Sequence, residues 1–117
     1  MILKEKAKIK IGIVGSGFIA RGLLNLIVSK NEFQISYVLT RSDITNRKCE
    51  IQKYLTNSVD ELIKNSDIIV ECSGSVVYAA EVLLKVMQNN IPVITMNTEF
   101  NVTVAVPLTT IQCSFLW

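Results

Sequence analysis

Three small residues near the N-terminus have the spacing of a phosphate-binding loop. The stretch GSGFIA at 15–20 reads G-x-G-x-x-A, with Gly15, Gly17 and Ala20 at the fixed positions. In such a loop the first glycine makes a tight turn, the second lets the backbone approach a pyrophosphate, and the small third residue lets the helix pack on a strand. The amides and the positive dipole end of that helix attract phosphate. The pattern predicts a dinucleotide site; the alternative is a turn whose small residues serve packing alone.

The residues after the second predicted strand bear on which dinucleotide binds. Where NAD is preferred an acid usually ends this strand, because a carboxylate bonds the ribose 2'-hydroxyl and repels a 2'-phosphate. This chain has Thr40, Arg41 and Ser42 there, and an arginine fork with hydroxyl groups can bind a phosphate. We therefore expect NADP to be preferred. Asp43, one residue later, keeps NAD open, as does the alternative that Arg41 is a solvated loop residue.

Small residues also follow the fourth predicted strand, in the stretch Glu71, Cys72, Ser73 and Gly74. We expect this loop to lie beside the half of the cofactor that is distant from adenine, with Gly74 allowing a close approach of the backbone. No basic residue near Cys72 in the sequence would lower its pKa. Cys72 is therefore predicted to be a small buried residue and not a nucleophile.

Few residues in the chain could carry chemistry unaided. Histidine, the commonest general base near neutral pH and the commonest metal ligand, is absent. Cys49, Cys72 and Cys113 are odd in number and form no C-x-x-C pair, so neither a disulfide framework nor a zinc site is indicated. We expect no catalytic residue and no metal site, so any reaction must rest on a cofactor or on another domain.

The composition bounds the remaining functions. The chain has 117 residues, 50% of them hydrophobic and 19% charged, which is typical of one compact folded domain. Its net charge of +2, with basic residues scattered among acids, does not favour nucleic acid. No apolar run is long enough to span a membrane, and charged residues at 4–6 interrupt the place of a signal peptide. We expect a cytoplasmic protein with no membrane or nucleic-acid partner.

Alternating strand and helix patterns must position these loops. Apolar and β-branched runs predict strands at 8–14, 33–40, 67–71 and 92–96, with 51–55 as a short strand at the sheet edge. Helical spacing predicts helices at 18–29 and 76–88, and the capping box SVDE at 58–61 predicts a short helix to Asn65. Within the first helix, Gly22 is interpreted as a close-packing position.

This alternation predicts an α/β fold with a doubly wound parallel sheet of Rossmann type, in three α/β/α layers and a single domain. Right-handed crossovers give the strand order 3-2-1-4-5 and place a ligand crevice at the carboxyl ends of strands 1 and 4, where the winding reverses. Loops 15–20, 72–75 and 97–101 are expected to converge there.

Two long stretches carry a resemblance to a known family. They are KIGIVGSGFIARGLL and SDIIVECSGSVVYAAEVLLKVMQNNIPVITMNTEFNVTV. With their spacing, they resemble the N-terminal NAD(P)-binding domain of homoserine dehydrogenases. They are more similar still to the homoserine dehydrogenase-like oxidoreductases that carry a SAF domain. The resemblance covers nearly the whole chain, and VITMNTEFNVTV is its most specific segment, because the glycine loop is shared by many unrelated dehydrogenases.

The resemblance implies a set of cofactor contacts. Those to the pyrophosphate are Gly15, Ser16, Gly17, Phe18 and Ile19; those to the adenosine ribose are Thr40, Arg41 and Ser42; those to the nicotinamide ribose are Ser73, Gly74 and Asn97. In homoserine dehydrogenases a Lys follows the Asn, whereas Thr98 stands here, which argues against homoserine itself as the substrate. Glu99, in the N-x-E pattern of the SAF-type relatives, is a candidate to face a substrate or, alternatively, a helix-start residue.

Members of this family continue into a catalytic and dimerising domain, and the chain resembles the cofactor module without it. We expect 1–117 to be one NAD(P)-binding domain. With a substrate domain it would support hydride transfer between nicotinamide and a small alcohol or carbonyl; alone it would bind without turnover. Apolar surface left uncovered would favour a homo-oligomer. The alternatives are a self-sufficient small protein, a non-catalytic nucleotide-binding or oligomerising Rossmann module and, third, a methyltransferase using S-adenosylmethionine, which the missing acid after the second strand disfavours.

Overall fold

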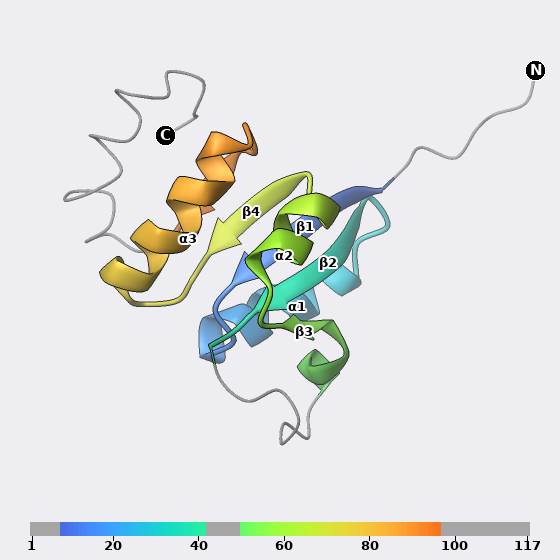
Figure 1. Cartoon of the computed structure of the whole chain (residues 1–117). Helices are drawn as coiled ribbons and strands as arrows, with labels where there is room; N and C mark the ends of the chain where they lie inside the picture. Colours follow the sequence, from blue (N-terminus) through green and yellow to red (C-terminus); the bar gives the residue numbers. More distant parts are fainter. Residues whose placement is uncertain (1–7, 42–49, 97–117) are drawn as a thin grey trace, which may run out of the picture.

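The computed structural model describes residues 8–41 and 50–96, in which strands and helices alternate along the chain (Figure 1). The strands are β1 (Ile9–Val14), β2 (Phe33–Leu39), β3 (Leu55–Thr56), β4 (Ile68–Glu71) and β5 (Val93–Thr95). The helices are α1 (Phe18–Val28), α2 (Val59–Asn65) and α3 (Val76–Gln88), and a 3-10 helix covers Glu50–Tyr54.

The strands form one parallel five-stranded sheet in the order β3-β2-β1-β4-β5, which confirms the predicted order. At the carboxyl end of β1, Val14 lies beside Leu39 of β2 and Glu71 of β4. Glu71 in turn lies beside Thr95 of β5. The strands therefore end along one edge of the sheet, and the loops that follow them emerge together where the winding reverses between β1 and β4.

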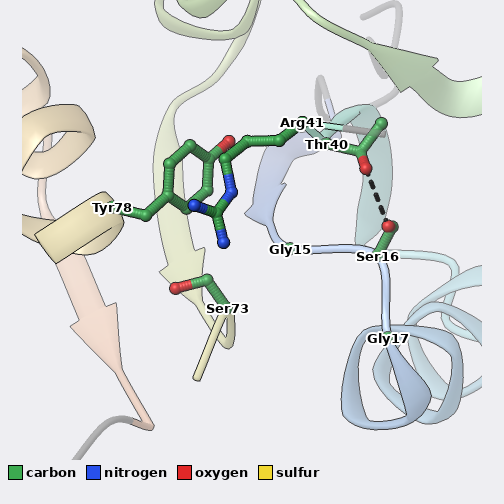
Figure 2. Close-up of a pocket in the computed structure, with 7 residues that line it drawn as sticks. All are labelled: Gly15, Ser16, Gly17, Thr40, Arg41, Ser73 and Tyr78. Atoms are coloured by element: carbon green, nitrogen blue, oxygen red, sulfur yellow. Dashed lines mark hydrogen bonds between the residues drawn. The ribbon is translucent and has the colours of Figure 1, made fainter. Parts of the chain in front are cut away.

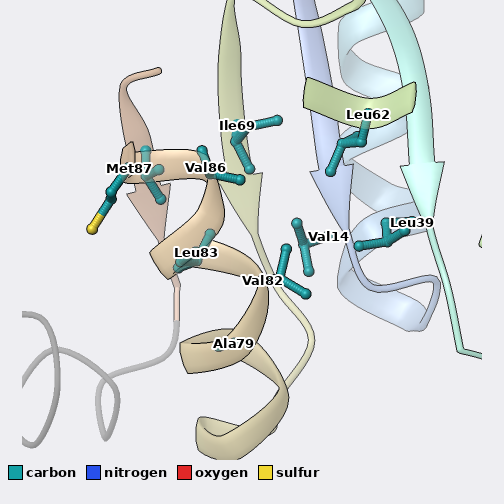
Figure 3. Close-up of a cluster of buried hydrophobic side chains, with 10 residues drawn as sticks. Val14, Leu39, Leu62, Ile69, Ala79, Val82, Leu83, Val86 and Met87 are labelled. Atoms are coloured by element: carbon teal, nitrogen blue, oxygen red, sulfur yellow. The ribbon is translucent and has the colours of Figure 1, made fainter. Parts of the chain in front are cut away.

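Helices cover both faces of the sheet and complete the predicted three α/β/α layers (Figure 1). On one face α1 packs through its buried residues Ala20, Leu24 and Ile27. On the other face α2 and α3 enclose a second cluster (Figure 3), formed by Val14, Leu39, Leu62, Ile69, Ala79, Val82, Leu83, Val86, Met87 and Val93. Burial of each large aliphatic side chain stabilises the fold by about 1.5–3 kcal/mol. A hydrophobic cluster on each face of the sheet thus stabilises the strand ends from which the loops emerge.

Helix α3 has the predicted bounds because local residues set both of its ends. Ser75 is its N-cap, and the Ser75 hydroxyl accepts a hydrogen bond from the Tyr78 amide at 3.3 Å. At the other end Asn90 has a φ of 59°, a left-handed conformation that asparagine tolerates better than most residues with a side chain.

Two sequence-based interpretations are wrong. Of the segment 51–55, only Leu55 pairs with β2, because the preceding residues lie in the 3-10 helix. Gly22 is exposed rather than closely packed, and an added Cβ would meet nothing within 4 Å in the described part of the chain. The reason is helical geometry: Ala20, Leu24 and Ile27 form the buried side of α1, and position 22 lies off it.

The capping box of α2 forms only in part. The Ser58 hydroxyl accepts from the Glu61 amide at 3.2 Å as predicted, but the Ser58 amide donates to Thr56 Oγ1 at 3.1 Å instead of to Glu61. The Glu61 carboxylate bonds the Tyr37 hydroxyl, and this bond together with the negative charge raises the pKa of Tyr37. The Glu61 side chain therefore bonds Tyr37 of β2, whereas the local capping-box pattern predicts that it bonds the start of α2.

Within residues 8–41 and 50–96, no helix is long and apolar enough to cross a membrane. The expected extent of the domain, 1–117, includes segments outside the described residues, so it stays a prediction. Ser42, Asn97, Thr98 and Glu99, singled out in the sequence, also lie outside them.

Candidate functional site

The turn between β1 and α1 is built around Gly15. Its φ is +105°, and an added Cβ would lie 2.8 Å from Ser73 Cα and 2.9 Å from the Cys72 carbonyl oxygen. The Gly15 amide donates to the Leu39 carbonyl at 2.8 Å, and the Cys72 amide donates to the Val14 carbonyl at 2.9 Å. The turn is thus held between the end of β2 and the loop after β4, where no side chain fits.

Helix α1 begins directly after this turn without a capping side chain. Gly17 is its N-cap, no side-chain hydrogen bond caps it, and its first turn contains no acid. By contrast, serine hydroxyls cap α2 and α3. Because the first amides of a helix have no intrahelical partner, the start of α1 offers donors and the positive dipole end to an anion. Phe18 and Ile19, in this first turn, have 91% and 54% of their surface exposed.

A buried hydroxyl pair joins the glycine loop to the end of β2. Ser16 Oγ donates to Thr40 Oγ1 at 2.9 Å, and the two residues are only 9% and 4% exposed. The Thr40 amide donates to the Thr56 carbonyl at 2.9 Å, and Asn57 Nδ2 donates to the Thr40 carbonyl at 2.6 Å. Thr40, directly before Arg41, is therefore held by hydrogen bonds to several neighbouring segments.

Arg41 is the one exposed cation on the pocket wall within the described residues. Its guanidinium carbon lies 4.3 Å from the ring centroid of Tyr78, in the first turn of α3, within the range of a cation–π contact. Figure 2 shows the Arg41 side chain extending from the end of β2 toward that ring. Burial raises the pKa of Tyr78, and the Arg41 charge opposes this with a smaller lowering effect. The tyrosine is therefore a neutral, half-buried ring facing a positive charge.

Glu71 holds the loop after β4 from inside. Its carboxylate is fully buried and accepts from the Ser73 amide at 2.7 Å, from the Ser73 hydroxyl at 2.5 Å and from Thr95 Oγ1 at 2.6 Å. A buried carboxylate needs such donors, because desolvation without them is costly. Glu71, expected beside the cofactor, thus turns its side chain to the protein, and it is Ser73 that reaches the pocket.

Cys72 is not activated by this environment. Burial, and after it the Glu71 charge, raise the pKa of the Cys72 thiol to about 11. A thiolate rather than a thiol is the nucleophile, so a thiol that stays protonated at neutral pH is unreactive. Cys72 is part-buried, in contrast to the small buried residue expected from the sequence; that it is not a nucleophile stays a prediction, which the raised pKa supports.

These elements enclose a pocket of about 170 Å³, and the residues that line it are Gly15, Ser16, Gly17, Thr40, Arg41, Ser73 and Tyr78 (Figure 2). The structure thus brings together residues from each of the three predicted contact groups. Phe18, Ile19 and Gly74, also predicted as contacts, do not line the pocket, and Ser42 and Asn97 lie outside the described residues.

Sequence reasoning missed Tyr78. Apolar residues with helical spacing lie at 76, 77, 80, 83, 84 and 87, and Tyr78 lies off that set. One signal in the sequence could have indicated it. Tyr78 is an aromatic residue in the first turn of the predicted helix 76–88, and this helix follows a strand that ends at the predicted crevice. Only the positions of β2 and α3 in space show that this ring lies opposite Arg41.

Known proteins share this domain. Residues 15–106 match the family described as homoserine dehydrogenase, NAD binding domain. Among curated proteins, no sequence matches the chain significantly. The crystal structure of S. aureus homoserine dehydrogenase at pH 7.0 is similar, with 25% sequence identity and a TM-score of 0.74, and the match covers 94% of this chain and 30% of that chain.

Two further solved structures share the fold. A homoserine dehydrogenase from Thiobacillus denitrificans is 21% identical with a TM-score of 0.72, covering 92% of this chain and 27% of that one. An engineered D-amino acid dehydrogenase bound to NADP+ is 19% identical with a TM-score of 0.64, covering 83% and 30%. The chain therefore spans about 30% of the length of the solved homoserine dehydrogenase of S. aureus.

Proposed function

Because this chain belongs to the homoserine dehydrogenase NAD-binding domain family, we propose that its pocket holds the diphosphate of the nicotinamide dinucleotide and that Arg41 makes NADP the preferred form. Dinucleotide binding is the property that the family's description states. The observation that carries the finer assignment is Arg41 on the wall of a pocket whose floor is the Gly15 turn.

The residues present fit a diphosphate. The Gly15 turn brings backbone to the pocket, and an added Cβ at Gly17 would meet nothing within 4 Å among the described residues, so the space before the loop is open. The uncapped start of α1 adds amide donors and a positive dipole. A pocket of about 170 Å³ is smaller than the roughly 300–1,000 Å³ typical of whole ligand sites. It therefore suits one portion of a dinucleotide.

The charges of the pocket support NADP. Of the residues that line it in the described part of the chain, Arg41 is the only charged one, and none is acidic. Glu71, at the end of β4, is buried and accepts from Ser73 and Thr95. Among the described residues that line the pocket, a 2'-phosphate would thus meet a guanidinium and no carboxylate. Ser42 stays a proposed contribution to the same phosphate, and Thr40 contributes by fixing the backbone before Arg41.

For the protein in which this domain works with a substrate domain, we propose hydride transfer involving a small alcohol or carbonyl compound. The nicotinamide supplies the hydride chemistry. The residues of this chain bind and orient: Ser73, held by Glu71, and Gly74 and Asn97 are the proposed contacts beside the nicotinamide ribose. The isolated chain is expected to bind without turnover. Homo-oligomerisation and a cytoplasmic location both remain predictions from the sequence.

Calorimetric titration of the chain with NADPH and, separately, with NADH tests the proposal. We expect NADPH to bind more tightly. Arg41→Ala should weaken NADPH binding about tenfold or more, since hydrogen bonds to charged groups are worth about 1.5–3 kcal/mol. The matched control is Arg21→Ala, which removes the same charge from an exposed position on α1 outside the pocket. An Arg41→Ala protein that binds NADPH as tightly as the parent would show that the assignment is wrong.

A further inference from the structure

We propose that Tyr78 is a positioning residue for the phosphate contact: its ring holds the Arg41 guanidinium over the pocket and thereby sets how strongly NADPH is preferred to NADH. The observation is the 4.3 Å separation between the Arg41 guanidinium carbon and the Tyr78 ring centroid, across a pocket that both residues line. The inference rests on the proposed function of Arg41 and assigns a role to a second residue that acts through it.

Tyr78 is anchored both by its side chain and by its backbone. Tyr78 is half-buried and packs against the core cluster under α3. Its amide donates to the Ser75 hydroxyl at 3.3 Å, and the Ser75 amide donates to Ser73 Oγ at 3.4 Å. Ser73 is in turn held by the buried Glu71 carboxylate. A continuous series of hydrogen bonds therefore holds the Tyr78 backbone from the sheet outward, and core contacts support its ring.

In the described part of the chain, the hydrogen bonds that hold the residue before Arg41 do not involve the guanidinium. Thr40 is fixed by the Ser16, Thr56 and Asn57 contacts, but Arg41 follows it as an exposed residue with a long side chain. Such a side chain samples many rotamers, and ordering it on binding lowers affinity. Contact with the ring restricts those rotamers before any ligand binds. Figure 2 shows that this contact directs Arg41 across the pocket, with its nitrogen atoms on the side of Ser73 and Gly15.

The contact leaves the arginine able to bind an anion. A guanidinium over an aromatic face interacts through its charge, so its N–H donors stay available to oxygen acceptors at its edge. Tyr78 should therefore act on the extra phosphate of NADPH and not on the parts that the two cofactors share. Lost packing at Tyr78 would weaken both cofactors alike, so the ratio of the two affinities separates positioning from a merely structural role.

The test is a calorimetric titration of the chain and its variants with NADPH and with NADH. Tyr78→Leu removes the ring face and keeps an apolar side chain, whereas Tyr78→Phe keeps the ring face and is the matched control. We expect Tyr78→Leu to weaken NADPH binding about fivefold, equivalent to about 1 kcal/mol, with NADH binding changed less than about twofold. Tyr78→Phe should keep the parent ratio. If Tyr78→Leu no longer folds, as shown by loss of its thermal unfolding transition in circular dichroism, Tyr78→Met replaces it.

A double-mutant cycle with Arg41→Ala separates the two proposals. If Tyr78 acts through Arg41, adding Tyr78→Leu to Arg41→Ala should change the affinity ratio no further. If Arg41→Ala keeps the NADPH preference, the proposed function of Arg41 fails. If Arg41→Ala abolishes the preference while Tyr78→Leu and Tyr78→Met keep it, or lower both affinities equally, the positioning role of Tyr78 is wrong and the Arg41 assignment stands.

Discussion

Replacing Gly15 by alanine tests whether the turn after β1 requires glycine. Gly15 has a φ of +105°, and the added Cβ would lie 2.8 Å from Ser73 Cα and 2.9 Å from the Cys72 carbonyl oxygen. Both are backbone atoms of a loop that β4 and the buried Glu71 hold in place, so neither can turn aside as the end of a long side chain can. The substitution therefore combines a strained backbone with an overpacked contact.

The two effects add to a measurable loss of stability. A positive φ in a residue with a Cβ costs about 1–3 kcal/mol, and overpacking a tight contact costs about 1–3 kcal/mol more. The expected decrease in the free energy of unfolding of Gly15→Ala is thus about 2–6 kcal/mol. For a domain of roughly 100 residues, each 1 kcal/mol lowers Tm by about 4 °C or more, so the expected decrease in Tm is at least about 8 °C.

Thermal unfolding followed by circular dichroism measures this decrease. The matched control is Gly17→Ala, two positions along the same loop, where φ is −82° and an added Cβ would meet nothing within 4 Å among the described residues. Its Tm should stay within about 3 °C of the parent value, because that φ is open to alanine. A Gly15→Ala protein that melts with its control at the parent Tm would refute the reasoning.

Three further predictions follow from the same contacts. Gly17→Ala should weaken NADPH binding about tenfold in calorimetry, because its Cβ takes the space through which phosphate approaches the loop; unchanged affinity would place the phosphate elsewhere. Glu71→Gln should lower the free energy of unfolding in urea by about 1–3 kcal/mol, since it leaves the Ser73 amide facing an amide group in place of a carboxylate; an unchanged urea midpoint would contradict this. Because the pKa of Cys72 rises from 9.0 to about 11 on folding, the folded state keeps a proton that the unfolded state releases, so stability should fall as pH rises through that range. The fall should be larger than in Cys72→Ala, and equal slopes would show that the thiol is not shielded.

Much of the fold could be predicted because its signals are local. Helix α3 has the predicted bounds, since Ser75 and Asn90 act within a turn of the ends they set. The short edge strand could not be predicted as well, because a strand requires a partner. Only Leu55 and Thr56 lie beside β2, and this depends on where the chain crosses that strand.

The site residues likewise divide into those that the sequence predicted correctly and those that it did not. The glycine loop, with Gly15 and Gly17, was predicted from its spacing, and both residues line the pocket. Phe18 was predicted from the same segment, but a helix rotates successive side chains by about 100°, and Phe18 is 91% exposed outside the pocket. Whether a loop residue reaches a cavity depends on the direction of its side chain, and the order of residues alone does not specify that direction.

By itself the sequence determined the alternation of strands and helices, the parallel sheet order, and a glycine turn at the carboxyl end of β1, because these follow from periodicity and from residues close together in the chain. The tertiary structure alone decided that Tyr78 lies opposite Arg41 and that Glu71 turns inward to Thr95. These contacts join segments that lie far apart along the chain. They form only because the sheet order brings the ends of β2, β4 and β5 to one edge.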